Sequence, residues 1–195
     1  WMRQNGLEAA VKKAAAAGTV VMGICGGYQM LGDTLDDPEH VEAGGTVRGM
    51  GLLPMDTVFE KQKTRTQTEG QFYTVSGPLS ALSGVRFKGY EIHMGVSTLK
   101  TGCRSLDRLR DGEKEDGAFA GNVYGTYVHG IFDEEAVAGA VIRGLCDGKG
   151  VDSTRMRAFD MEAYKERQYD ILADAVRRNM DMDAVYRILE EGIQI

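Results

Sequence analysis

An apolar run that leads directly into a glycine-rich turn most constrains how this chain can fold. Residues 19–22 (TVVM) form an apolar, β-branched segment of strand length, and residues 23–27 then read G-x-C-G-G around Cys25. This is the cysteine form of the nucleophile elbow, in which a strand turns sharply into a helix. A nucleophile at such a turn is strained, and glycines beside it remove Cβ atoms that would clash. The sequence therefore predicts that Cys25 is exposed at the N-terminus of a helix, where unpaired N–H groups favour a thiolate.

Composition narrows the class of function. The net charge of −6 gives no electrostatic basis for binding nucleic acid, and no apolar run approaches the roughly 20 residues that span a bilayer. The three cysteines, Cys25, Cys103 and Cys146, are odd in number and lack the spacing of a metal site. We therefore expect a reduced, cytoplasmic protein without a metal, a nucleic-acid partner or a membrane segment. Because Trp1 already lies within helical sequence, we also expect the chain to be a piece of a longer polypeptide.

The remaining patterns predict a three-layer α/β fold, with a mostly parallel sheet and helices on both faces. Residues 1–150 form the predicted domain, and residues 151–195 form a helical tail of the same domain. Residues 33–38 read as a turn, 39–51 as a loop, 60–68 as a solvated strand or loop, and 102–117 as an exposed charged connection. Predicted strands cover 52–59, 71–76, 85–94 and 122–129, and predicted helices cover 1–17, 134–145, 159–180 and 183–191.

A histidine at the end of a second strand suggests the partner of Cys25. His129 ends the strand NVYGTYVH, and open α/β sheets bind ligands at the carboxyl ends of their strands. A thiolate beside an imidazole is the minimal set for attack on an amide, since the imidazolium can protonate the leaving amine. His93 competes for the base role from within a strand, whereas His40 reads as an ordinary surface or core group. The plainer alternative, that Cys25 is a small buried apolar residue, stays open on these residues alone.

Three motifs and the C-terminal segment resemble one family of enzymes. The motifs are GICGGYQMLG, RFKGYEIHMG and GTYVHGIFD, and the segment is YDILADAVRRNMDMDAVYRIL. They resemble the class I, Cys–His type glutamine amidotransferase domain of cobyric acid synthases. The resemblance implies that Cys25 is the nucleophile and His129 its base, and that Gly26 and Gln29 hold the oxyanion and the glutamine.

The resemblance also implies a division of labour. Glutamine is hydrolysed through a γ-glutamyl thioester, and the ammonia passes to an N-terminal, ATP- and Mg²⁺-dependent synthetase domain of the same polypeptide. That domain amidates a corrinoid in cobalamin biosynthesis. The chain contains no G-x-x-x-x-G-K-[ST] motif, so we expect no cofactor in it. The alternatives are a sister glutaminase, serving cobyrinate a,c-diamide synthesis or amidation of a cell-wall lipid precursor, and a non-catalytic docking domain.

Two departures from the wider class bear on the site. Many class I amidotransferases carry a glutamate two residues after the histidine, but Gly130 and Ile131 follow His129, as in the cobyric acid synthase branch. Glu91, Asp133 or a backbone carbonyl could orient the imidazole instead. The resemblance further implies an upstream segment that supplies the other oxyanion donor. We therefore expect the chain by itself to be a weak or inactive glutaminase.

Overall fold

The computed structural model describes residues 1–110, 113–154, 156 and 159–192, and the chain divides into two compact units, Trp1–Ala158 and Phe159–Ile195. The helices of the first unit are α1 (Leu7–Ala16), α2 (Gly26–Leu31) and α3 (Glu135–Asp147), with 3₁₀ turns η1 (Ser80–Leu82) and η3 (Ile131–Asp133). Its strands are β1 (Val21–Ile24), β2 (Thr34–Asp37), β3 (Gly45–Arg48), β4 (Met55–Phe72), β5 (Arg86–Leu99), β6 (Asp107–Leu109), β7 (Lys114–Asp116), β8 (Ala118–Ala120), β9 (Val123–Thr126) and β10 (Val128–His129).

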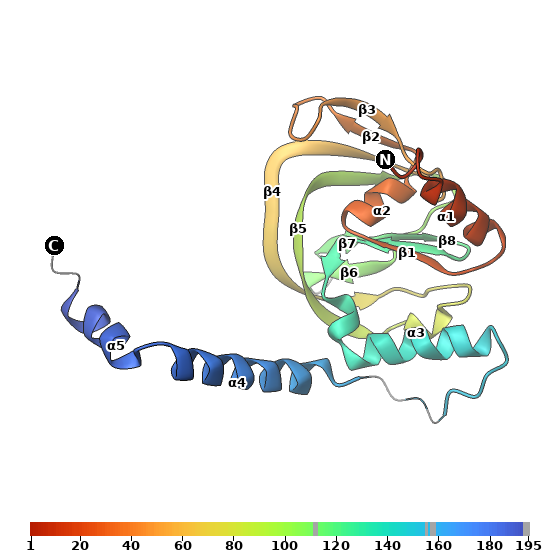
Figure 1. The fold of residues 1–195 in the computed structure, drawn as a ribbon. Helices are drawn as coiled ribbons and strands as arrows, with labels where there is room; N and C mark the ends of the chain where they lie inside the picture. Colours follow the sequence, from red (N-terminus) through yellow and green to blue (C-terminus); the bar gives the residue numbers. More distant parts are fainter. Residues whose placement is uncertain (111–112, 155, 157–158, 193–195) are drawn as a thin grey trace. The chain divides into compact units, whose positions relative to one another are not determined.

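A small sheet in the order β1-β9-β8 forms the middle of three layers (Figure 1). Side chains alternate between its two faces. On one face, Met22 and Ile24 of β1 join a core with Val137 of α3. On the other face, Val21 joins a core with Tyr28 of α2, and α1 adds to that core. Helices thus cover both faces, which confirms the predicted α/β class.

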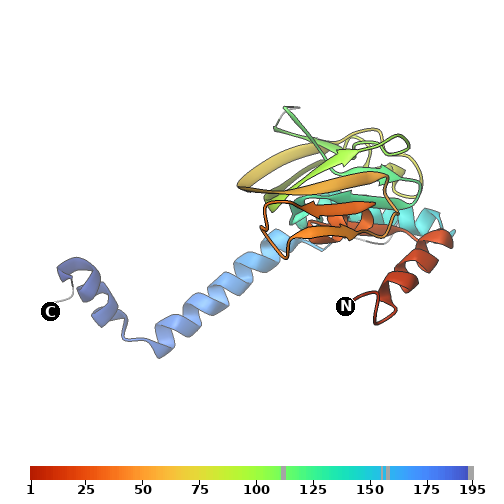
Figure 2. The ribbon, with the colours of Figure 1, turned by 90° about the horizontal axis from the view of Figure 1, so that it is seen from above.

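A larger sheet in the order β10-β5-β4-β2-β3 lies beside the first, with β6 and β7 attached to β4. Its frame is the pair β4 and β5, which are 18 and 14 residues long and run antiparallel side by side (Figure 2). The described strands pair in parallel only in β1–β9 and β2–β4, so the sheets are mixed rather than mostly parallel. Connections too short for a crossover account for the antiparallel pairs β2–β3 and β8–β9.

Several segments expected to be irregular are strands. β2 occupies most of the predicted turn at 33–38, and β3 lies within the predicted loop at 39–51. The polar stretch 60–68 is the middle of β4, where sheet pairing decides the conformation and the outward side chains are exposed. The predicted exposed connection at 102–117 contains β6 and β7, and it buries both Asp107 and Asp116; residues 111–112 lie outside the described part.

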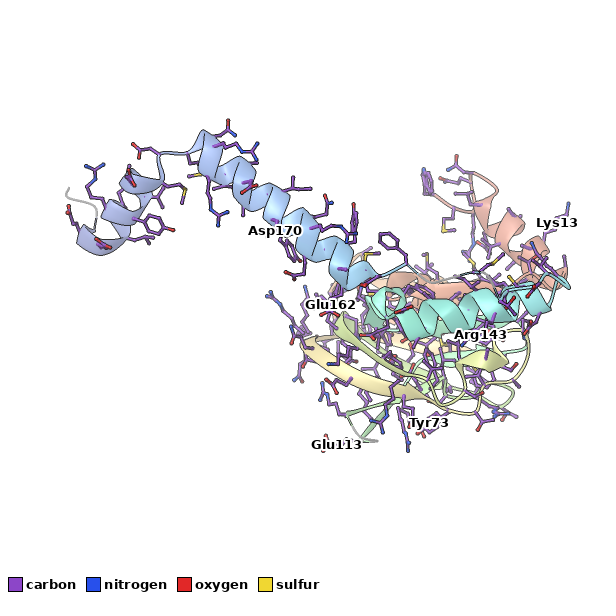
Figure 3. The ribbon with its side chains drawn as sticks, turned by 90° about the horizontal axis from the view of Figure 1, so that it is seen from below. Lys13, Tyr73, Glu113, Arg143, Glu162 and Asp170 are labelled. Atoms are coloured by element: carbon purple, nitrogen blue, oxygen red, sulfur yellow. The ribbon has the colours of Figure 1, made fainter. Side chains whose placement is uncertain are left out.

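The second unit consists of two helices, α4 (Met161–Asn179) and α5 (Met182–Glu191), close to the predicted ranges. Each begins at an aspartate whose side chain accepts a backbone N–H, from Ala163 for Asp160 and from Ala184 for Asp181, both at 2.9 Å. Neither helix has a buried residue, and α4 displays side chains such as Glu162 and Asp170 around its axis (Figure 3). Across the described residues, we find no helix with the length and apolar character needed to cross a membrane.

Candidate active site

Cys25 occupies a strained turn between β1 and α2, as the motif predicts. Its φ of 52° and ψ of −115° are far from the values of a strand or a helix, and φ is in the range that disfavours side chains. Two hydrogen bonds hold the turn: the Cys25 N–H donates to the Thr126 carbonyl at 2.9 Å, and the Gln29 N–H donates to the Cys25 carbonyl at 3.0 Å. The backbone therefore fixes where the thiol points.

The glycines of the elbow are not equivalent. A Cβ built on Gly23 would lie 2.6 Å from backbone atoms of Gly27 and Tyr28, so only glycine lets the strand approach the helix this closely. A Cβ on Gly26 or Gly27 would meet nothing within 4 Å. The steric requirement that the sequence suggested for all these glycines thus holds for Gly23. As the first residue of α2, Gly26 has an N–H without an intrahelical acceptor, next to the thiol.

Strand pairing brings Cys25 and His129 to the same region. In the parallel pair of β1 and β9, the last residues of the two strands, Ile24 and Thr126, lie opposite each other. Cys25 directly follows β1, and His129 lies three residues after the end of β9, so both follow neighbouring strand ends. The Cys25 thiol lies 3.5 Å from the carbonyl oxygen of Ile92 on β5. His129 belongs to β10 and lies opposite Tyr90 of β5, the strand that also contains Ile92. The thiol thus contacts a main-chain oxygen of β5 and the imidazole stacks on a side chain of β5, so both predicted catalytic side chains lie beside residues 90–92 of this strand.

The imidazole of His129 stacks on the ring of Tyr90. The ring centroids are 5.2 Å apart and the planes differ by 5°. The Nε2 atom of His129 is buried and has no hydrogen-bond partner among the described residues. Gly130 follows with a φ of 74°, and Ile131, at the position of the missing glutamate, is fully buried in the core. Ile131 therefore supports the fold and leaves His129 without an acid at that position.

Glu91 belongs to the opposite face of β5. It lies opposite Val128 rather than His129, and its buried carboxylate contacts the Nζ of Lys114 and the Nε2 of His93, the latter at 3.3 Å. Burial alone would raise the pKa of Glu91, but the hydrogen bonds from His93 and Lys114 outweigh it and hold the pKa at about 2. The structure does not bring Glu91 to His129.

His93 contacts Glu91, which lies two residues before it on β5. Its Nδ1 is 2.8 Å from the Gly95 carbonyl oxygen, and its Nε2 faces Glu91, so both ring nitrogens already have oxygen partners. Its ring also stacks on Tyr127, with centroids 3.9 Å apart. These contacts favour a structural role for His93 and leave His129 as the better placed base.

The other predicted site residues differ in how they are placed. Gln29 is buried, and its Nε2 donates to the Tyr127 hydroxyl at 3.3 Å, so the contact with glutamine that the resemblance implies stays a prediction. Asp133 lies on η3, close to the turn after His129: its Oδ2 is 3.6 Å from where a Cβ on Gly130 would be. Asp133 remains a candidate orienter of the imidazole.

A buried set of acids beneath the site was missed at the sequence level. Asp116 accepts hydrogen bonds from the Thr126 hydroxyl at 2.6 Å and the Tyr127 N–H at 3.1 Å, which anchors the segment that ends in His129. Burial raises the pKa of Asp116, and it raises the pKa of Asp107 further. Residues 106–109 read L-D-R-L, which lacks the two-residue alternation of a half-buried strand, so this stretch gave no sequence signal for the burial of Asp107. No group of three or more His, Cys, Asp or Glu that could hold a metal occurs among the residues described.

Comparison with known families agrees with this geometry. Residues 1–137 match the family of CobB/CobQ-like glutamine amidotransferase domains. The chain belongs to this family. Both Cys25 and His129 lie within the matched range, and so does the whole of β5. The thiol, the imidazole and the strand β5 beside them are thus parts of a glutamine amidotransferase domain.

Curated relatives of this domain are longer proteins. The cobyric acid synthase of Ruminiclostridium cellulolyticum is 48% identical over 200 aligned residues, which cover 100% of this chain and 39% of that protein. The cobyric acid synthase of Citrobacter koseri is 45% identical, with 98% of this chain and 38% of that protein covered. The chain therefore spans about two fifths of the length of the curated relatives it matches.

Solved structures support the fold. A glutamine amidotransferase crystal structure superposes with a TM-score of 0.53 at 21% identity, over 77% of this chain and 71% of that one. The PurLQS structure from Thermotoga maritima superposes with a TM-score of 0.54 at 20% identity, over 71% of this chain and 68% of that one. At these identities the likeness concerns the fold, which is that of class I glutamine amidotransferases.

Proposed function

We propose that this domain hydrolyses glutamine to glutamate and ammonia, with Cys25 as the nucleophile and His129 as the general acid and base. One observation carries the proposal: the strained elbow and the β10–β5 pairing bring the thiol of Cys25 and the imidazole of His129 to the same short segment of β5, residues 90–92. A domain kept only for docking a partner would need neither the strained cysteine nor the convergent histidine.

The proposed chemistry uses groups already in place. The Cys25 thiolate attacks the γ-amide carbon of glutamine, and the Gly26 N–H donates to the oxyanion that forms. His129 then protonates the leaving nitrogen, so ammonia departs and a γ-glutamyl thioester remains. Water, deprotonated by His129, attacks the thioester, which releases glutamate and restores the thiol. One glutamine and one water thus give one glutamate and one ammonia.

The relatives favour a specific use for the ammonia. Because the curated relatives are cobyric acid synthases, we propose that the ammonia amidates corrinoid carboxylates at an ATP- and Mg²⁺-dependent synthetase site elsewhere in the same polypeptide. This reading is favoured over a sister glutaminase by identities of 45–48% across nearly the whole chain.

The test compares two sources of nitrogen in the full-length polypeptide. Cys25→Ala removes the ammonia source without touching the synthetase site. Amidation of the corrinoid should therefore be lost with glutamine and retained with ammonium chloride. Cys103→Ala, a change at a cysteine whose burial raises its pKa, serves as the matched control and should retain both activities.

Two outcomes would contradict the proposal. Glutamine-dependent amidation that survives Cys25→Ala would show that another group is the nucleophile. Loss of ammonium-dependent amidation in the same variant, with its thermal melt unchanged, would show that the two sites are not separate in the way proposed.

A further inference from the structure

We infer that Tyr90 is a positioning residue for His129: its ring, stacked parallel to the imidazole, holds the plane of the general base. The inference rests on the proposed function of His129 and deepens it. Among the residues described, Tyr90 makes the one aromatic contact recorded for His129, with centroids 5.2 Å apart and planes 5° from parallel.

The stack is built into the backbone. Tyr90 and His129 are register partners in the antiparallel pair of β5 and β10, which puts their side chains on one face at the closest cross-strand distance. The neighbouring Gly89 lets β10 approach closely, because a Cβ there would lie 2.4 Å from the His129 carbonyl oxygen. A wider strand separation would pull the two rings apart.

The remainder of the site explains why such a contact is needed. The position that carries an acid in many amidotransferases holds the buried Ile131, and the carboxylate of Glu91 lies on the other face of β5, so Asp133 is the one predicted acid that stays a candidate orienter. A hydrogen bond to a ring nitrogen fixes one atom of an imidazole, whereas a stacked ring restricts rotation of its plane. The Tyr90 stack therefore supplies a constraint that does not depend on an acceptor for His129.

The exposure of Tyr90 fits this role better than a structural one. Its side chain is 44% exposed, so it contributes little to the core. One of its faces is covered by the imidazole of His129. The electron-rich face of a tyrosine also attracts an imidazolium, which is the form of His129 that protonates the leaving nitrogen.

The experiment uses glutamine hydrolysis by the full-length polypeptide, with kcat and KM measured separately. Tyr90→Leu keeps apolar bulk and removes the ring, and we expect kcat to fall about fivefold with KM within about twofold, in line with the usual strength of an exposed cation–π contact. Tyr90→Phe keeps the ring and should retain most of kcat. Val96→Ala is the matched control, because Val96 lies on the same face of β5 and is 49% exposed.

Each result decides the inference. A wild-type kcat in Tyr90→Leu overturns it, as does a Tyr90→Phe variant as slow as Tyr90→Leu, which would assign the effect to the hydroxyl. An equal loss in Val96→Ala would show a general disturbance of β5. If thermal melts show Tyr90→Leu to be less stable, Tyr90→Thr, with its high strand propensity, replaces it. Failure of the proposed function looks different: glutamine hydrolysis would then survive in Cys25→Ala and in His129→Asn.

Discussion

Gly23→Ala should disrupt the elbow more than any other change of comparable size. A Cβ at this position would lie 2.6 Å from the carbonyl carbon and oxygen of Gly27 and from the backbone nitrogen of Tyr28. All three are backbone atoms, so no side chain can rotate away. An ordinary contact begins at 3.4 Å, and 3.4 minus 2.6 leaves a shortfall of about 0.8 Å. Either β1 or the start of α2 must move by that amount.

The cost of this movement can be estimated in stability and in rate. Overpacking of this kind costs about 1–3 kcal/mol, which lowers the melting temperature of a domain of this size by about 2–12 °C. Cys25 lies between the two elements that must separate, so its thiol moves with them. A displacement of roughly 1 Å at a reacting atom costs on the order of 10²-fold in turnover. Glutamine hydrolysis and a thermal melt, both on the full-length polypeptide, measure the two effects.

Gly27→Ala provides the control on the same turn. Its Cβ would meet nothing within 4 Å, and its position in α2 favours alanine over glycine by about 0.5–1 kcal/mol. This variant should melt at or above the wild-type temperature. If Gly23→Ala has the same melting temperature as Gly27→Ala, the steric account of the elbow is refuted.

One chemical labelling and two substitutions test other parts of the site. Limited treatment with the glutamine analogue diazo-oxo-norleucine should label Cys25 and leave Cys103 unmodified, because burial raises the pKa of the Cys103 thiol; mass spectrometry of the peptides locates the adduct. Gly89→Ala would place a Cβ 2.4 Å from the carbonyl oxygen of His129 and should lower kcat by about tenfold or more, with urea unfolding as the check on stability. Glu91→Gln should lower the free energy of unfolding by about 3 kcal/mol at pH 7, since it breaks a buried ion pair. The pKa of Glu91 falls from 4.5 to about 2 on folding, so this difference is present above pH 4.5 and should shrink as the pH falls toward 2; a constant difference would contradict the ion-pair account.

The predicted strand 122–129 is two strands, β9 in the small sheet and β10 in the larger one, so the prediction of a single strand was wrong. The sequence was a better guide to the elbow and to the end of strand structure at His129. Both depend on local signals: glycines around Cys25 after an apolar run, and a β-branched and aromatic run that stops at His129. Parallel pairing of β1 and β9 then brings the two strand ends together, as the carboxyl-end rule predicts. Helices α4 and α5 lie close to the predicted ranges, and each begins at an aspartate that accepts a hydrogen bond from a residue three positions later, which is also a local interaction.

The pairing of β5 with β10, and its register, could not be predicted from one sequence. Glu91 and His93 were correctly placed on one face of a strand, but which face meets His129 depends on the register with β10, a strand of two residues. A short strand carries no periodic pattern, so its register cannot be inferred from composition. The burial of Asp107 had a similar cause, because charged residues are usually exposed and tertiary packing overrode that tendency.

The register of β10 on β5 explains why the stretch GYEIHMG alternates in chemistry. Its outward residue Tyr90 stacks on the imidazole of His129, while Glu91 and His93 point inward to a buried ion pair with Lys114. A slip of one residue would turn Glu91 toward the catalytic face and leave Lys114 without its carboxylate. Such a slip would also bring a side chain against the His129 carbonyl, where only Gly89 fits. The buried pair therefore helps to fix the register of β5, which keeps Tyr90 opposite His129.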